Sequence, residues 1–95
     1  MATYKEAFHP KIKSDLKKID KSVVKKIKAY HLQKILDDPF RYESLKGTLS
    51  GLRAYHFKEQ GVEYRIAYEV TQERVIFYYM IAKRENFYKK ITNRI

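Results

Sequence analysis

The clearest pattern along the chain is a strict alternation of apolar and other residues over positions 62–70. The apolar members of this alternation are Val62, Tyr64, Ile66, Tyr68 and Val70. A period of two places successive side chains on opposite faces of a strand, so the segment predicts a β-strand with one buried and one polar face. Leu52–Lys58 predicts a preceding strand, joined to it through a turn at Glu59–Gly61. The nearly uninterrupted apolar run Val75–Ala82 is typical of a central strand covered on both faces.

The first forty residues show helical spacing instead. Pro10 suits the first turn of a helix. The apolar positions that follow it at helical spacing are Ile12, Leu16 and Ile19. Asp20 and Ser22 are candidate caps of a second helix that runs to about Leu36. Pro39 disfavours helical backbone at the residue before it, so we expect this helix to end there.

The two ends of the chain complete the predicted order. Thr3–Phe8 alternates weakly and predicts a short strand, and Lys83–Ile95 predicts a final helix whose apolar residues step by four. The predicted order is β-α-α-β-β-β-α. It indicates an α+β fold in which an N-terminal strand and a two-helix hairpin pack on a small antiparallel sheet. With 95 residues, the chain is expected to form one domain over residues 1–95.

Composition and charge narrow the class of protein. Hydrophobic residues make up 44% of the chain, which excludes disorder, and the absence of cysteine excludes disulfide scaffolds and thiolate metal sites. No apolar run predicts a membrane span or a signal peptide, so we expect a cytoplasmic protein. With 21 basic and 11 acidic residues the formal net charge is +10, which favours a polyanionic partner over a merely solvated lysine-rich surface.

Candidate chemistry lies on the polar side of the predicted sheet. Arg65 occupies the polar face of the best-patterned strand, and the neighbouring strands contribute further polar residues, namely Arg53, Tyr55, His56, Lys58, Lys83 and Arg84. Converging cations, histidine and tyrosine without paired carboxylates suit a phosphate, and specifically an RNA phosphate. Cleavage of RNA by its own 2′-OH needs a base, an acid and cations for the growing charge. The alternative is an ordinary solvent-facing strand in which Arg65 pairs with Glu63 or Glu69.

The remaining histidines favour structural roles, and no metal or cofactor is expected. His31 lies on the apolar stripe of the second predicted helix, and His9 stands beside Pro10 in a predicted turn. The three histidines fall on three separate elements without the spacing of metal ligands.

Three segments in order resemble the RelE/ParE superfamily of toxins from bacterial toxin–antitoxin modules. They are Leu45-Lys46-Gly47-x-x-x-Gly51-Leu52-Arg53, then Tyr64-Arg65-Ile66-x-Tyr68, then Ala82-Lys83-Arg84-Glu85-x-Phe87-Tyr88. The resemblance implies a small antiparallel sheet packed by two N-terminal helices. It also implies metal-independent cleavage of mRNA on the ribosome and inhibition by a cognate antitoxin protein.

The resemblance assigns roles to individual residues. Arg65 is expected to stabilise the scissile phosphate, Arg84 to act near the leaving group, and Tyr88 to serve as base or stacking group. His56 matches a histidine that takes part in cleavage in the YafQ branch, although members of that branch carry a histidine where Arg84 stands. His56, Arg65, Arg84 and Tyr88 are therefore the candidate catalytic residues. The candidate RNA contacts are Arg53, Tyr55, Lys58 and Lys83.

Two questions stay open at this point. The general base is either His56, with Tyr88 stacking on the substrate, or Tyr88; the former assignment is favoured because histidine titrates near neutral pH. Two other functions also fit. One is a ParE-like toxin that binds and poisons DNA gyrase without cleaving RNA, and the other is a generic basic nucleic-acid-binding module, which would need none of these residues.

Overall fold

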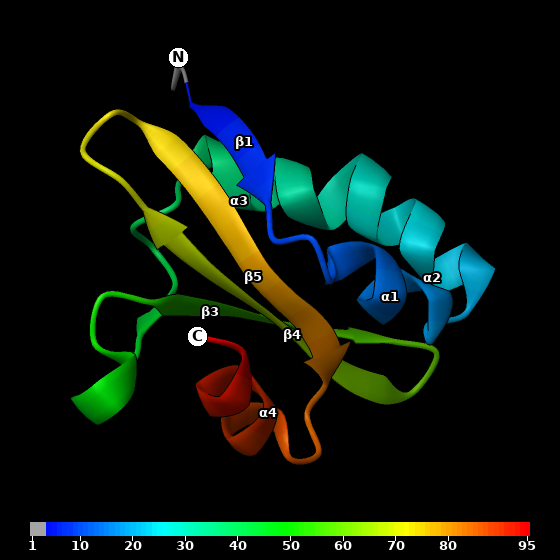
Figure 1. Cartoon of the computed structure of the whole chain (residues 1–95). Helices are drawn as coiled ribbons and strands as arrows, with labels where there is room; N and C mark the ends of the chain where they lie inside the picture. The colour runs from blue at the N-terminus through cyan, green and yellow to red at the C-terminus, as the bar shows by residue number, and fades with distance from the viewer. Residues whose placement is uncertain (1–3) are drawn as a thin grey trace.

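The computed structural model describes residues 4–95, and the predicted start of the first strand at Thr3 lies outside this range. A five-stranded sheet in the order β1-β5-β4-β3-β2 forms the centre of the molecule (Figure 1). Its strands are β1 Lys5–Phe8, β2 Glu43–Ser44, β3 Arg53–Glu59, β4 Val62–Val70 and β5 Val75–Lys83. Helices α1 (Ile12–Lys17), α2 (Lys21–Lys26) and α3 (Leu32–Asp37) cover one face, and α4 (Phe87–Arg94) covers the other.

The predicted α+β class and the order of the elements are confirmed, with two additions. Strand β1 pairs with β5 in parallel, so the sheet is mixed, whereas the pairs β5–β4, β4–β3 and β3–β2 are antiparallel. The two-residue strand β2 and the 3₁₀ turn η2 (Gly47–Leu49) fill the segment between the helices and β3. Both are too short to leave a periodic signal in the sequence.

Two hydrophobic clusters pack on the two faces of the sheet. The larger cluster joins the helical hairpin to the sheet and includes the alternating residues Tyr64, Ile66 and Tyr68 of β4. The smaller cluster lies under α4 and includes Ala67, Met80, Phe87 and Ile91. This arrangement explains why β5 is apolar on both faces, and why Ala67, the one apolar residue on the opposite face of β4, lies under α4.

The second predicted helix is interrupted by a π-helical turn. Asp20 caps its start, because its carboxylate accepts hydrogen bonds from the Ser22 amide at 2.9 Å and the Ser22 hydroxyl at 2.6 Å. The segment then continues as α2, the π-helical turn η1 (Ile27–His31) and α3. Because the π turn inserts an extra residue, the face presented by the helix shifts at His31.

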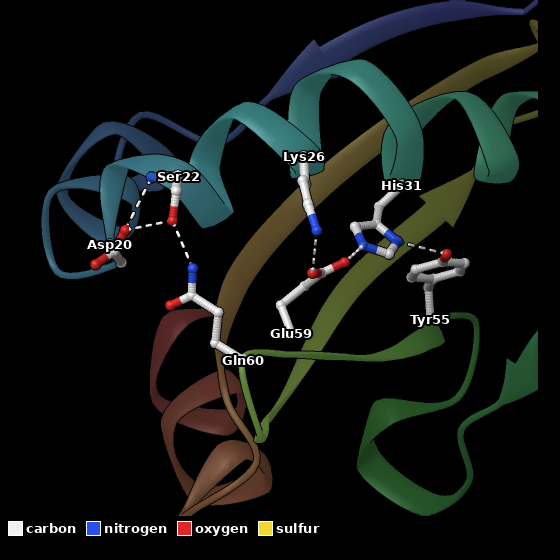
Figure 2. A network of polar contacts seen from close by, with 7 residues as sticks. All are labelled: Asp20, Ser22, Lys26, His31, Tyr55, Glu59 and Gln60. Carbon is white, nitrogen blue, oxygen red and sulfur yellow. Dashed lines mark hydrogen bonds and ion pairs between the residues drawn. The ribbon is translucent and has the colours of Figure 1, made fainter.

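His31 connects the helical hairpin to the edge of the β3–β4 hairpin. Its ring contacts the Tyr55 hydroxyl at 2.8 Å and the Glu59 carboxylate at 2.8 Å, and Lys26 binds the same carboxylate at 3.2 Å (Figure 2). His31 is 4% exposed and stacks on Phe57 at a ring distance of 4.1 Å. His31 therefore has the structural role that its place on the apolar stripe predicted.

The C-terminal helix begins later than the sequence pattern suggested. Lys83 is the last residue of β5, where it pairs in register with Tyr64, and α4 starts at Phe87. Asn86 precedes the helix in the left-handed conformation with φ 57°, which makes the turn sharp. In the described part of the chain no helix is long and apolar enough to cross a membrane.

Candidate functional site

The candidate site lies on the sheet face that carries α4. His56 of β3 stands opposite Arg65 of β4, and Arg65 stands opposite Ala82 of β5. Directly opposed residues of antiparallel strands point to the same face, so His56 and Arg65 are neighbours there. The next pair of β3 and β4 on this face of the sheet is Lys58 with Glu63. A shallow hollow of about 220 Å³ lies at this place, with His56, Lys58, Glu63 and Arg65 among its walls.

Arg65 is the central cation of the site. Its guanidinium carbon lies 5.1 Å from the centroid of the Tyr88 ring and 5.9 Å from that of Phe87. Phe87 is 1% exposed and anchors the start of α4, so the ring contacts hold Arg65 beside the helix. Among residues 4–95 Arg65 has neither a hydrogen-bond acceptor nor an ion-pair partner, which leaves its N–H donors available to a ligand.

The two carboxylates that could have paired with Arg65 have other partners. Glu63 binds Arg84, with 2.8 Å between Glu63 Oε2 and Arg84 Nη1, and Glu69 accepts a hydrogen bond from the Tyr79 hydroxyl at 3.0 Å. The hydrogen bond from Arg84 holds the pKa of Glu63 below its usual range. Arg65 therefore does not form the ion pair with Glu63 or Glu69 that the sequence allowed.

His56 is held by a residue that the sequence reasoning missed. Its Nε2 atom lies 2.7 Å from Oε1 of Glu43, and both side chains are about half exposed. Glu43 reaches this place because β2 pairs with β3 and sets Glu43 opposite Ala54, two residues from His56 on the same face. No pattern marks Glu43 in the sequence, since a strand of two residues has no detectable period. The contact leaves Nδ1 of His56 without a partner among residues 4–95.

Arg84 lies just past the end of β5. Its backbone amide donates to the Glu63 carbonyl at 2.9 Å, and its side chain is 63% exposed. Lys58 and Arg84 therefore flank Glu63, while Tyr88 flanks Arg65 on the other side. Together these residues form an open cationic surface with one imidazole and one phenol, which suits an anion that also carries a ring able to stack.

Two of the eight predicted residues do not reach this surface, because strand alternation turns Arg53 and Tyr55 to the helical-hairpin side of β3. Lys83 pairs with Tyr64 on that side of the sheet, but at the end of β5 it lines a hollow together with Glu63 and Arg84. Arg53 donates to the carbonyls of Phe40 at 3.0 Å and Tyr42 at 2.9 Å.

Tyr55 is part of the buried contact with His31 and is 5% exposed. Burial, aided by the neighbouring Tyr42, raises the pKa of Tyr55 to about 12. The structure therefore assembles His56, Arg65, Arg84, Tyr88 and Lys58, and places Arg53 and Tyr55 in structural contacts.

Among residues 4–95 no group of three or more histidine, aspartate or glutamate side chains is placed to hold a metal ion. The His9 ring accepts a hydrogen bond from the Lys11 amide at 3.1 Å, which is the local turn role expected for it.

Comparison with known proteins places this arrangement in a family. Over the whole chain the fold is similar to that of a free Escherichia coli RelE toxin in which two arginines are replaced by alanine, with 24% identity, 99% coverage of that protein and a TM-score of 0.76. It is also similar to the toxin–antitoxin complex RelBE2 of Mycobacterium tuberculosis, with 19% identity, a TM-score of 0.70, and coverage of 85% of this chain and 98% of that one.

A third similar structure is the intact Escherichia coli RelBE toxin–antitoxin complex, with 24% identity, a TM-score of 0.69, and coverage of 87% of this chain and 99% of that one. A search of curated proteins gave no match. Residues 7–92 match the family described as ParE-like toxin of type II bacterial toxin-antitoxin system. Because the match extends over nearly the whole chain, the protein belongs to the family of ParE-like toxins of type II toxin–antitoxin systems.

Proposed function

We propose that this toxin is an endoribonuclease that cuts mRNA on the ribosome by attack of the RNA's own 2′-OH, without a metal ion. The observation that carries the proposal is Arg65: a guanidinium with free donors stands between the imidazole of His56 and the ring of Tyr88. Such a donor, fixed before the reaction, stabilises the charge that develops on phosphate oxygens. A toxin that acts on translating ribosomes works in the cytoplasm.

The chemistry assigns one role to each residue of the site. Arg65 binds the non-bridging oxygens of the scissile phosphate, with a planar fork that matches phosphate geometry. His56 accepts the 2′-OH proton at Nδ1, because Glu43 occupies Nε2, and the 5′-oxygen that leaves the phosphorus takes a proton from water. Tyr88 presents its ring to a base, as aromatic side chains do in single-stranded RNA recognition.

Arg84 is the second cation of the reaction. One of its nitrogen atoms binds Glu63, and a guanidinium carries five N–H donors in all, so others remain for the leaving group or the adjacent phosphate. Lys58 supplies a further positive charge at the same end of the site. With these side chains as the charge carriers, the mechanism has no step that needs a divalent ion.

A cognate antitoxin is the proposed partner of the free toxin. The similar RelBE2 and RelBE structures are both toxin–antitoxin complexes, from Mycobacterium tuberculosis and Escherichia coli. We expect an antitoxin to inhibit this chain in the same general way, by occupying part of the exposed cationic and apolar surface.

The decisive experiment combines mapping in cells with cleavage by the purified toxin. Primer extension on mRNA after induction should show discrete cuts, and programmed ribosomes should reproduce them in vitro. Arg65→Ala should lower the single-turnover rate by about 10²–10³-fold, the usual loss for one preorganised donor. Lys25→Ala, at an exposed position of α2 outside the site, is the matched control and should cleave like the wild type.

Intact mRNA together with DNA breaks linked to gyrase would overturn the proposal in favour of the second candidate, a ParE-like gyrase poison. The observation that favours this candidate is the family match itself, together with the two carboxylates, Glu43 and Glu63, that bind His56 and Arg84 in the site. Nucleic-acid binding that is unaffected by Arg65→Ala, without either activity, would indicate a generic binding module.

A further inference from the structure

A second basic surface lies between α1 and α4, away from the Arg65 site. Both helices flank the C-terminal half of β5, from opposite faces of the sheet (Figure 1). Between them is a groove of about 420 Å³, here called the α1–α4 groove. Its charged walls consist of Lys11, Asp15, Lys18, Lys83, Lys90 and Arg94. None of these residues belongs to the site described above, except that Lys83 adjoins Arg84.

The one acidic side chain of the groove is neutralised. Arg94 binds Asp15 through two nitrogen atoms, with Nη1–Oδ2 at 2.6 Å and Nη2–Oδ1 at 2.9 Å. The Ile81 amide donates to the same Oδ2 at 3.0 Å. The side chains of Asp15 and Arg94 are only 8% and 13% exposed, so this pair contributes little net charge to a ligand in the groove.

The remaining charged groups of the groove are all positive. Among residues 4–95 none of the four lysines that line it forms an ion pair, and these lysines are Lys11, Lys18, Lys83 and Lys90. They come from both ends of α1, from the end of β5 and from α4. The floor between them is apolar and includes Ile19, Met80 and Ile81. Cations without partners around one groove concentrate positive potential there.

Side chains already bind the backbone of β5 in the groove, which argues against a peptide strand as the ligand of the groove. Strand β1 pairs only with Val75–Tyr78, so the later part of β5 has a free edge. On this edge the Ile81 amide binds Asp15 and the Tyr79 carbonyl accepts from Arg94 at 2.9 Å. An added strand would have to break the buried Asp15–Arg94 pair, whereas a ligand that uses only the lysines leaves the pair intact.

The groove adjoins the candidate site at Lys83. This residue lines the α1–α4 groove and also the hollow formed by Gly61–Glu63 and Arg84–Asn86, which holds the carboxylates of Glu63 and Glu85 as well as Arg84. Lys83 therefore stands between Arg84 and the other lysines of the groove. We propose that the α1–α4 groove binds the sugar–phosphate backbone of the RNA strand whose scissile phosphate lies at Arg65. This inference rests on the proposed function for the identity of the strand, but not for the presence of the groove.

Phosphate contacts of this kind position a strand without reading its sequence. The groove therefore adds affinity and sets the direction in which the RNA leaves the site, and it does not select a codon. The number of phosphates bound is measurable, because each contact with a single strand contributes about 0.7 to the slope of log K against log salt concentration.

The experiment uses the full chain and 2′-O-methyl oligouridylates of 4 and 12 nucleotides, which cannot be cleaved through the 2′-OH. Binding is followed by fluorescence anisotropy over a range of KCl concentrations. The wild type should bind the longer strand more tightly and with a steeper salt slope. The double variant Lys18→Ala/Lys90→Ala should lose most of the advantage of the longer strand, and its slope should fall by about 1.4, as expected for two lost contacts.

The matched control is Lys25→Ala/Lys34→Ala, which removes the same charge from exposed positions of α2 and α3 outside the groove. It should keep both the slope and the length dependence. Equal slopes for the two double variants would overturn the inference. So would loss of binding to a polyglutamate peptide in the groove variant with RNA binding unchanged, because the ligand would then be an acidic peptide.

The outcomes separate this inference from the proposed function. If the wild type cleaves mRNA and the groove variant binds RNA as the control does, the function stands and the groove assignment is wrong. A different result would be that the wild type cleaves no mRNA, while the groove variant still shows a smaller salt slope and a smaller preference for the longer RNA strand. In that case the groove binds RNA and the cleavage proposal is wrong. Circular dichroism and thermal unfolding verify that both double variants are folded.

Discussion

Arg94 and Asp15 are 79 residues apart in the sequence, and they form a two-pronged ion pair that joins α4 to α1 past the free edge of β5. The pair also binds the backbone of β5 at Tyr79 and Ile81, so three elements meet at one nearly buried contact. Tyr88 lies at the other end of α4, so this contact helps the buried residues Phe87 and Ile91 to hold the helix that carries the Tyr88 ring.

The first prediction concerns the Asp15–Arg94 pair. Arg94→Met leaves the Asp15 carboxylate buried with only a backbone donor, and it should lower the free energy of unfolding by about 3–5 kcal/mol. Arg94→Lys should recover part of this loss, since one charge–charge contact survives. Urea unfolding measures both, with Arg41→Met, at an exposed arginine of the described chain, as the control. An Arg94→Met variant as stable as the wild type would show that α4 is held by its apolar face alone.

The second prediction concerns Tyr88. Its ring lies against Arg65, and its hydroxyl has no partner among residues 4–95. If the ring stacks on an RNA base, Tyr88→Phe should retain most of the cleavage rate on programmed ribosomes. Tyr88→Ala should lose about 1–3 kcal/mol of binding, the contribution of one stacked base. Lys89→Ala, the next residue of α4, is the control. Equal inactivity of the Phe and Ala variants would assign proton transfer to the Tyr88 hydroxyl.

The third prediction concerns Glu43 and His56. His56→Ala should slow single-turnover cleavage by about 10²–10⁴-fold, the usual contribution of a general acid or base. Glu43→Gln should slow it only by a few-fold, because exposed ion pairs contribute about 0.2–1 kcal/mol.

If Glu43 acts by orienting His56, its substitution has no further effect once His56 is alanine, and the double-mutant cycle shows this as non-additivity. Glu73→Gln, in the exposed turn before β5, is the control. Additive losses in the double variant would mean that Glu43 acts independently of His56.

The fourth prediction is a pH dependence of stability. The pKa of Tyr55 is raised to about 12 by burial, while a tyrosine of the unfolded chain titrates near about 10. The folded state therefore resists ionisation of Tyr55, so its contribution to stability is complete below about pH 10 and declines as the pH rises toward 12. Burial raises the pKa of Tyr68 and Tyr78 as well, which steepens the decline.

Urea unfolding at pH 8, 10 and 11 measures this effect. Tyr55→Phe should cost about 1 kcal/mol at pH 8, through the lost contact with His31, and should lose less stability than the wild type between pH 10 and pH 11. If the free energy of unfolding fell equally with pH in the two proteins, Tyr55 would not contribute to the loss of stability at alkaline pH.

Local order in this protein follows directly from its sequence. The period of two in β4 determines that Tyr64, Ile66 and Tyr68 enter the core and that Arg65 faces the other way, because a strand alternates its side chains. The helical spacing up to Ile19 and the cap at Asp20 are likewise local properties, since their hydrogen bonds close within a few residues.

The register of β3 against β4 decides on which face of the sheet each predicted site residue of β3 lies. The two-residue turn Gln60-Gly61, with φ of 54° and 79°, sets His56 opposite Arg65 and therefore sends Arg53 and Tyr55 to the other face. Arg53 and Tyr55 were predicted as RNA contacts, and in the structure both bind partners near the helical hairpin.

Only the tertiary structure decided the contacts that join distant segments. The parallel addition of β1, the approach of Glu43 to His56, and the Asp15–Arg94 pair each join residues with no local signal for one another. An irregular register in β5, where Tyr68 faces Tyr78 but Ala67 faces Met80, puts Tyr78 and Met80 on opposite faces although their spacing is two. The sequence alone therefore determined the longer elements and the side of β4 on which Arg65 lies. Long-range packing determined its neighbours, because their contacts form only when the sheet and its two helical layers have come together.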